Sequence, residues 1–257
     1  MISTDALLQW LNKTLEPDRF SDYCPNGLQV QGRSNIEHIV TGVTASLALI
    51  DKACKLGADA ILVHHGWFWR NEDPTIRGQR YHRIKRLIEA QINLIAYHLP
   101  LDAHPTLGNN AQLARQLGLE PSLDDTGKPL TCGPGGLVWL GKPGPGQESI
   151  QGLLEKIESS LARKPTWIGQ TNGATGKVAW CTGGAQGMYE AAIAAGANTY
   201  ITGEISEPSA HIARESQTTF ISAGHHATER YGVLALGQAV EQALGVKVTF
   251  IDIDNPA

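Results

Sequence analysis

The chain has 257 residues, of which 42% are hydrophobic and 18% are charged, and its formal net charge is −4. This length and apolar content suit one large domain or two small ones, and they exclude collagen-like and disordered classes of protein. The slightly acidic balance differs from that of a dedicated DNA-binding domain, which is usually basic.

Targeting signals and cysteine usage indicate where the protein resides. Every apolar run falls far short of the roughly 20 residues that a membrane helix needs. The N-terminus lacks the basic and apolar regions of a secretory signal. The four cysteines, at positions 24, 54, 132 and 181, form no CxxC pair. We therefore expect a cytoplasmic protein without a membrane partner.

The first part of the chain alternates between helix and strand patterns. Leu7, Leu8, Leu11 and Leu15 recur at helical spacing, which predicts a helix over Thr4–Leu15 with Thr4 as its N-cap. Further predicted elements are a strand at 38–44, a helix at 46–56, a strand at 60–63, a helix at 81–90 and a strand at 93–97. This alternation is typical of an α/β protein whose parallel sheets are covered by helices.

The same order of elements returns in the second part. The predicted elements are a strand at 177–182, a helix at 186–195, a strand at 198–202, a helix at 209–215 and a strand at 218–222. Gly57 then matches Gly196, and Gln91 matches Gln217. The pattern indicates an internal duplication of a β-α-β-α-β unit, although short Gly-Ala matches also arise by chance.

A segment rich in glycine and proline, residues 124–146, lies between the two parts. We interpret it as the domain boundary, which gives a first half at 1–125 and a second half at 126–257. The segment matches neither a Walker loop nor a GxGxxG motif that opens a helix, so phosphate binding there is not favoured.

Three clusters of histidine and carboxylate each follow a predicted strand, where open α/β sheets place their ligand sites. They hold six of the nine histidines and are His64-His65-Gly66, His98 through Asp102 with His104 beyond, and His225-His226 through Glu229. His225 and Glu229 are four residues apart, so a helix there would present both on one face. Pro100 favours a loop for the second cluster.

The two adjacent histidines need a local change of direction to act together. Successive side chains of a strand point to opposite sides, so His64 and His65 would diverge within one. A turn at Gly66 would let both reach the same cleft. His65 falls opposite Glu204 when the two halves are aligned.

These side chains are suited to binding metal ions. Imidazole and carboxylate ligands without cysteine suit Zn, Fe, Mn, Co or Ni, and do not select among them. One metal ion with an open position needs about three protein ligands, so five candidate ligands are more than one ion usually takes. Two ions that share a bridging carboxylate use five or six. Such a site would stay net positive and would attract hydroxide and anionic oxygens.

Other interpretations of these residues stay open. A pair of adjacent histidines is often structural, and His98 could orient Asp102 from behind. Glu204 could support a metal ligand from behind, act as a catalytic group, or be only the start of a helix. The aromatic residues at 67–69 could stack a base, or pack in the core or against another subunit. The basic residues between Arg70 and Arg86 could be a solvated helix face or a phosphate-binding patch.

Several segments resemble one known family. They are SDYCPNGLQVQG (21–32), VTGVTAS (40–46), ADAILVHHG (58–66), HLPLDAHPTLGNN (98–110), TGEISE (202–207) and AGHHATER (223–230). Together they resemble the GTP cyclohydrolase I type 2 homologue family, the NIF-three-like group with its bacterial YbgI-type proteins. The resemblance covers essentially the whole chain.

The resemblance implies a fold, an assembly and a ligand set. It implies two related α/β halves with helix-covered sheets, a metal site in the cleft between them, and a toroidal homohexamer. By matching motif positions it implies two divalent ions held by His64, His65, Asp102, His225 and Glu229, with Glu229 bridging. The short chain lacks the inserted central domain of longer family members.

The function implied is metal-dependent hydrolysis of GTP or a related purine nucleotide. In that reaction a metal-bound hydroxide would add to C8 of the imidazole ring, and His98 is the first candidate for moving protons. A phosphoesterase or damaged-nucleotide hydrolase could use the same ions. The alternatives outside catalysis are a metal-binding adaptor or metal-handling protein, and a ring that holds nucleic acid.

Overall fold

The computed structural model describes residues 1–169 and 173–257, which form two compact units. Unit 1 comprises Met1–Gly108 and Gly232–Asp254, and unit 2 comprises Asn109–Tyr231 and Asn255–Ala257. This division differs from the single boundary expected near residue 125. The Gly- and Pro-rich segment makes tight turns inside unit 2, where it supplies β8 (Thr131–Cys132) and β9 (Val138–Lys142).

Unit 1 is built on a five-stranded sheet with the order β14-β4-β5-β6-β2. The strands are β14 (Lys247–Phe250), β4 (His38–Thr44), β5 (Ala60–His65), β6 (Asn93–Ala96) and β2 (Gly27–Val30). The first four are parallel, and β2 is antiparallel to β6. A two-stranded pair, β1 (Ile2–Ser3) with β3 (Asn35–Ile36), lies outside this sheet.

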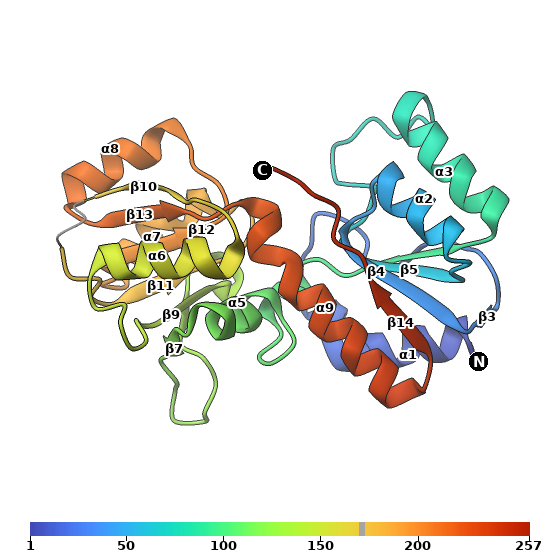
Figure 1. Cartoon of the computed structure of the whole chain (residues 1–257), viewed down its shortest axis with the longest axis horizontal. Coiled ribbons are helices and arrows are strands. Elements are labelled where there is room, and N and C mark those ends of the chain that lie inside the picture. Colours follow the sequence, from blue (N-terminus) through green and yellow to red (C-terminus); the bar gives the residue numbers. More distant parts are fainter. Residues whose placement is uncertain (170–172) are drawn as a thin grey trace. The chain divides into compact units, whose positions relative to one another are not determined.

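Helices cover both faces of the unit 1 sheet (Figure 1). Helices α1 (Thr4–Leu15) and α9 (His225–Leu244) pack on one face, and α2 (Leu47–Lys55) and α3 (Gly78–Ala90) pack on the other. A 3₁₀ turn, η1 (Pro17–Arg19), follows α1. The predicted range of α1 is confirmed, but its N-cap is Ser3, whose side chain accepts a hydrogen bond from the Ala6 N–H.

Unit 2 contains a mixed sheet with the order β10-β13-β12-β11-β9-β7, and β8 pairs with β9. The strands not yet defined are β10 (Thr166–Ile168), β13 (Thr219–Ser222), β12 (Thr199–Thr202), β11 (Val178–Trp180) and β7 (Glu120–Pro121). Among the described strands of this sheet, the parallel pairs are β11 with β12 and β12 with β13. The expected parallel sheet therefore forms the centre, and antiparallel strands extend it at both edges.

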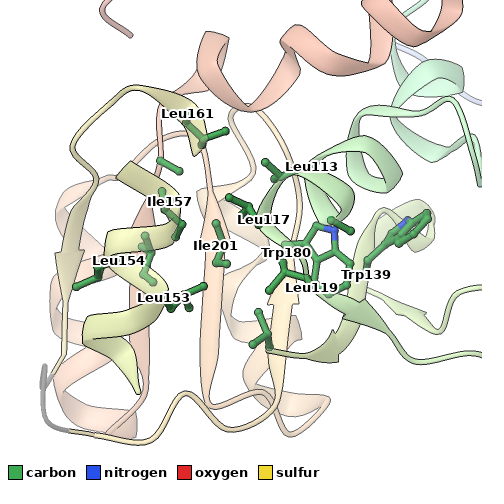
Figure 2. Packing of buried hydrophobic residues seen from close by; sticks show 14 of the residues in the cluster. Leu113, Leu117, Leu119, Trp139, Leu153, Leu154, Ile157, Leu161, Trp180 and Ile201 are labelled. Atoms are coloured by element: carbon green, nitrogen blue, oxygen red, sulfur yellow. The ribbon is translucent and has the colours of Figure 1, made fainter. Parts of the chain in front are cut away.

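The two faces of the unit 2 sheet have different cores. Helices α5 (Asn109–Leu117) and α6 (Ile150–Leu161) pack leucine and isoleucine side chains against Trp180 and Ile201 (Figure 2). The opposite face is aromatic, because Tyr189 of α7 (Tyr189–Ala194) stacks on Tyr200 at 5.5 Å between ring centroids. Helix α8 (Glu207–Ser216) and the 3₁₀ turns η2 (Pro134–Gly136) and η3 (Gln186–Met188) complete the unit.

The internal repeat is visible in the topology of the two units. In unit 1 the order is β4-α2-β5-α3-β6, and in unit 2 it is β11-α7-β12-α8-β13. An antiparallel strand flanks the third repeat strand in each unit, β2 beside β6 and β10 beside β13. The matched Gln91 and Gln217 both end a helix in the left-handed conformation with φ 55°. The two units are therefore related α/β halves.

Two general properties concern membranes and disulfides. Within 1–169 and 173–257, no helix is both long and apolar enough to cross a membrane. The described residues also contain no disulfide.

The unit 2 core offers a direct test of the packing. Replacing fully buried Leu153 by alanine should lower the free energy of unfolding by about 2–5 kcal/mol, because it removes apolar contacts and leaves a cavity. The matched control Leu123→Ala changes a side chain that is 57% exposed and should cost less than about 0.5 kcal/mol. Chemical denaturation measures both, and equal effects would contradict the packing.

Candidate metal centre

The side chains expected to bind metal in unit 1 lie where parallel strands end. His64 and His65 close β5, and His98 follows β6. Asp102 lies in the short helix α4 (Leu99–Ala103), so the loop expected from Pro100 is wrong. Proline is tolerated in the first turn of a helix because its missing N–H has no partner there in any case.

His64 has the environment of a metal ligand. Its ring is fully buried, and Nδ1 lies 3.0 Å from the carbonyl oxygen of Tyr97. A carbonyl only accepts, so Nδ1 carries a proton, and in the neutral ring Nε2 keeps its lone pair. That nitrogen lies 3.4 Å from Oδ1 of Asp102. Metal-binding histidines characteristically donate their second ring N–H to a carbonyl or carboxylate in this way.

His65 and His98 complete a group of three imidazoles in unit 1. His65 Nδ1 lies 3.1 Å from Oγ1 of Thr44, the residue that β4 places opposite it in the sheet. The His65 ring centroid lies 4.5 Å from that of His64 and 5.8 Å from that of His98. One ring nitrogen of each histidine lies within 4.8 Å of the others. The adjacent histidines therefore lie close together although both belong to β5, and the structure has no turn at Gly66 of the kind expected from the sequence.

His98 is held by Asp22, a residue of the motif at 21–32 to which the sequence assigns no role. Its Nδ1 lies 2.7 Å from Oδ1 of Asp22, whose side chain is only 3% exposed. Oδ2 of Asp22 accepts hydrogen bonds from the Leu99 N–H and from Nδ2 of Asn26. Burial alone would raise the pKa of Asp22, but the bond and charge of His98 and the other N–H donors outweigh it and lower that pKa to about 2.

The three aromatic residues after His65 have separate roles. Trp67 is buried and donates from Nε1 to the carbonyl of Ala45. Phe68 is 38% exposed. The rings of Trp69 and His98 are nearly perpendicular with centroids 4.9 Å apart, and the Trp69 centroid lies 6.0 Å from that of His65. Trp67 therefore anchors the segment in the core, and Trp69 packs beside the histidine group.

The basic segment that follows is largely neutralised by its own neighbours. Arg77 pairs with Asp73, Arg80 with Glu72, Lys85 with Glu89 and Arg86 with Asp51. Arg70 donates to the backbone carbonyl of Asp22. These pairings favour the solvated helix face over the phosphate-binding patch.

In unit 2, His225 lies between two carboxylates. It is the first residue of α9, and its Nδ1 lies 2.7 Å from Oε1 of Glu204. Its Nε2 lies 3.2 Å from Oε2 of Glu229, one helical turn further on, so the predicted shared face is confirmed. Burial lowers the pKa of His225, but the two carboxylates outweigh burial and raise it to about 9.

Backbone packing holds this second cluster in place. Gly183, just after β11, has φ 68°, and a Cβ there would overlap Oε1 of the buried Glu229. Its N–H donates to Oγ1 of Thr228, which in turn donates to the carbonyl of His225. Only glycine therefore fits beside the carboxylate. A glycine near the end of a predicted strand was the available signal for this position.

The two remaining histidines of the sequence clusters have other contacts. Nδ1 of His104 accepts hydrogen bonds from the backbone N–H groups of Thr106 and Leu107, which stabilises that turn. His226 is buried, and its backbone N–H donates to the carbonyl of Ala257. Neither belongs to the groups of candidate ligand atoms found among the described residues.

Each unit thus presents imidazole nitrogens together with a nearly buried carboxylate. Unit 1 offers His64, His65 and Asp102, and unit 2 offers His225 and Glu229. Nitrogen and carboxylate oxygen without thiolate form a donor set that fits a divalent transition metal. Clusters of this composition could bind a metal ion.

Comparisons with known proteins find relatives that match almost the whole chain. The model of the family Duf34/NIF3 (NGG1p interacting factor 3) matches residues 2–256. A "GTP cyclohydrolase 1 type 2 homolog" of Neisseria meningitidis is 49% identical with all of both chains covered, and one of Escherichia coli is 50% identical with 98% of each covered.

Solved structures give the same result. The protein ybgI, titled as of unknown function, superimposes with a TM-score of 0.89 at 48% identity over the whole of both chains. A protein of Thermus thermophilus reaches a TM-score of 0.82 at 30% identity, again over both whole chains. The chain therefore belongs to the Duf34/NIF3 family.

Proposed function

We propose that the protein is a hydrolase that depends on two divalent metal ions, held by His64, His65, Asp102, His225 and Glu229. The observation that carries the proposal is the state of the His64 ring, whose Nδ1 faces the carbonyl of Tyr97 and whose Nε2 faces Asp102. A divalent ion between Nε2 and the Asp102 carboxylate would use the nitrogen lone pair and compensate the buried charge at the same time. Zn, Fe, Mn, Ni and Co all suit these ligands.

The bound ions would supply positive charge and would lower the pKa of water toward neutrality. The chain's own residues would orient the ligands and move protons. Glu204 holds His225 from the side opposite Glu229, which sets the ring's direction. His98 lies beside His64 with a ring centroid distance of 5.1 Å, so it is well placed to accept a proton during hydrolysis. Trp69 would shield His98 from bulk water.

A purine nucleotide, with GTP as the first candidate, is the substrate that we propose. The support is the printed name of the relatives, "GTP cyclohydrolase 1 type 2 homolog", and a site whose ions would attract phosphate oxygens. Hydrolysis of a phosphoester or of a damaged nucleotide would use the same groups. The cytoplasmic location stays a prediction.

The ligand assignment is tested by removing one histidine and one carboxylate together. The double variant His225→Ala, Glu229→Ala should lose at least one ion per chain while it stays folded, as measured by elemental analysis and circular dichroism. His211→Ala with Glu207→Ala is a matched control, because this exposed pair has the same residue types at the same helical spacing. Unchanged metal content in the folded site variant would refute the assignment.

Turnover separates an enzyme from a metal-binding protein. A panel of nucleotides is incubated with the metal-loaded protein, with Asp102→Asn and with His98→Gln. Asp102→Asn removes a ligand charge, so the rate should fall by orders of magnitude. His98→Gln should keep its metal and slow turnover roughly 10²–10⁴-fold. If the wild type hydrolyses no member of the panel, a metal-binding role replaces the hydrolase.

We also propose that the chain assembles with itself, as a toroidal hexamer. Large apolar side chains stand exposed on unit 1, among them Phe68, Tyr81 and Ile88 at 38%, 45% and 57%. Light scattering should give a mass several times the 27.6 kDa of one chain. A mass near 27.6 kDa that persists across concentration and salt would exclude the ring.

A further inference from the structure

Asp22 forms a compact clamp on the start of α4. Its Oδ1 lies 2.7 Å from Nδ1 of His98 and accepts the N–H of Tyr23, and its Oδ2 accepts the Leu99 N–H and Nδ2 of Asn26. Asn26 completes the clamp, because its Oδ1 accepts the His98 backbone N–H at 2.8 Å. Two side chains from one loop therefore cap a helix that has no side-chain cap of its own.

The clamp determines which nitrogen of His98 carries the proton. An ionised carboxylate only accepts, so the neutral His98 ring must keep its proton on Nδ1. The lone pair then remains on Nε2, on the other side of the ring from Asp22, and the His98 ring lies beside those of His64 and His65, with centroid distances of 5.1 and 5.8 Å. A carboxylate that fixes the tautomer of a histidine base and stabilises the imidazolium is a recurring catalytic arrangement.

We propose that Asp22 is the positioning residue for His98: it holds the imidazole as the Nδ1–H tautomer so that Nε2 can take a proton. In that step an O–H bond of the attacking water breaks, an Nε2–H bond forms, and the electron pair stays on oxygen. The resulting imidazolium keeps its second N–H on Asp22. The catalytic part of this inference rests on the proposed function, whereas the tautomer does not.

The effect of Asp22→Asn follows from the donors around the carboxylate. The Leu99 N–H and Asn26 Nδ2 both donate to the Oδ2 position, whereas Tyr23 is the one backbone N–H that donates to Oδ1. The amide oxygen should therefore occupy the Oδ2 position, where it keeps two donors, and the amide NH₂ should take the Oδ1 position, where the Tyr23 N–H loses its acceptor. A backbone N–H is always a donor, whereas the neutral His98 ring can move its proton from one nitrogen to the other. Its Nδ1 should lose the proton and accept from the amide, which moves the ring proton to Nε2.

Solid-state NMR of protein labelled with ¹³C and ¹⁵N in histidine reads the tautomer directly. The metal-free protein is measured about two pH units above the ordinary histidine pKa of about 6.5, where a free ring is neutral. Subtraction of the His98→Gln spectrum identifies the His98 signals. The wild type should show the Nδ1–H tautomer, and Asp22→Asn should show Nε2–H as the major form.

Asp59→Asn is the matched control for a merely structural effect. Asp59 is also a nearly buried carboxylate of unit 1 that accepts backbone N–H groups, those of Glu37 and His38, and pairs with a cationic side chain. It lies at the start of β5, so its replacement should leave the His98 tautomer unchanged. An unchanged tautomer in Asp22→Asn, or the same change in Asp59→Asn, would overturn the proposal.

Metal content and turnover separate this proposal from the proposed function. Asp22→Asn should keep the metal content of the wild type, and its turnover should fall roughly 10²–10⁴-fold, with no further loss when His98→Gln is added. Loss of metal would make Asp22 a support of the ligands and would overturn the proposal. If the wild type turns over no nucleotide, the hydrolase fails, but the NMR result still decides the tautomer.

Discussion

The parallel pairing of three consecutive strands in each unit is the constraint on which the candidate centre depends. Parallel strands all end at one edge of their sheet, so the residues that directly follow them are brought together without further design. In unit 1 that edge collects His65 from β5 and His98 after β6, and in unit 2 it collects Glu204 after β12 and His225 after β13. Duplication of one fold unit therefore supplies two clusters of similar chemistry.

Burial of charge explains why these clusters favour a cation. The carboxylates of Asp102 and Glu229 are both nearly buried, and a buried carboxylate is costly without a compensating positive charge. Each has a histidine ring nitrogen within 3.4 Å. The raised pKa of His225 lets its imidazolium supply that charge to Glu229, whereas the His64 ring donates its Nδ1 proton to the Tyr97 carbonyl and supplies no charge to Asp102 while it is neutral. A divalent ion would compensate the carboxylates and would use the nitrogen lone pairs at the same time.

Local patterns predicted much of the fold and the main candidate residues. The range of α1, the strand His38–Thr44 and the shared face of His225 and Glu229 all follow from spacing within one element. Helix α6 was missed, although its apolar residues recur at helical spacing. The boundary expected near residue 125 differs from the observed division into units, because glycine and proline occur in tight turns inside a sheet as readily as in linkers.

Contacts between distant segments set the limit of prediction from one sequence. Asp22 and His98 are separated by 76 residues, and no local pattern indicates that the loop before β2 reaches the residues after β6. The return of the chain to unit 1 through α9 and β14 is likewise a pairing over more than 200 residues, since Thr249 lies beside Val40. The loop expected from Pro100 was wrong because the effect of a proline depends on whether it lies in the first turn of a helix or interrupts one.

The claim that five residues hold two ions is tested most directly by anomalous diffraction from crystals of the metal-loaded protein. The account predicts two strong anomalous peaks per chain, with His64, His65, Asp102, His225 and Glu229 as the ligands. Peaks confined to exposed pairs such as His211 with Glu207, or none at these five residues, would contradict it.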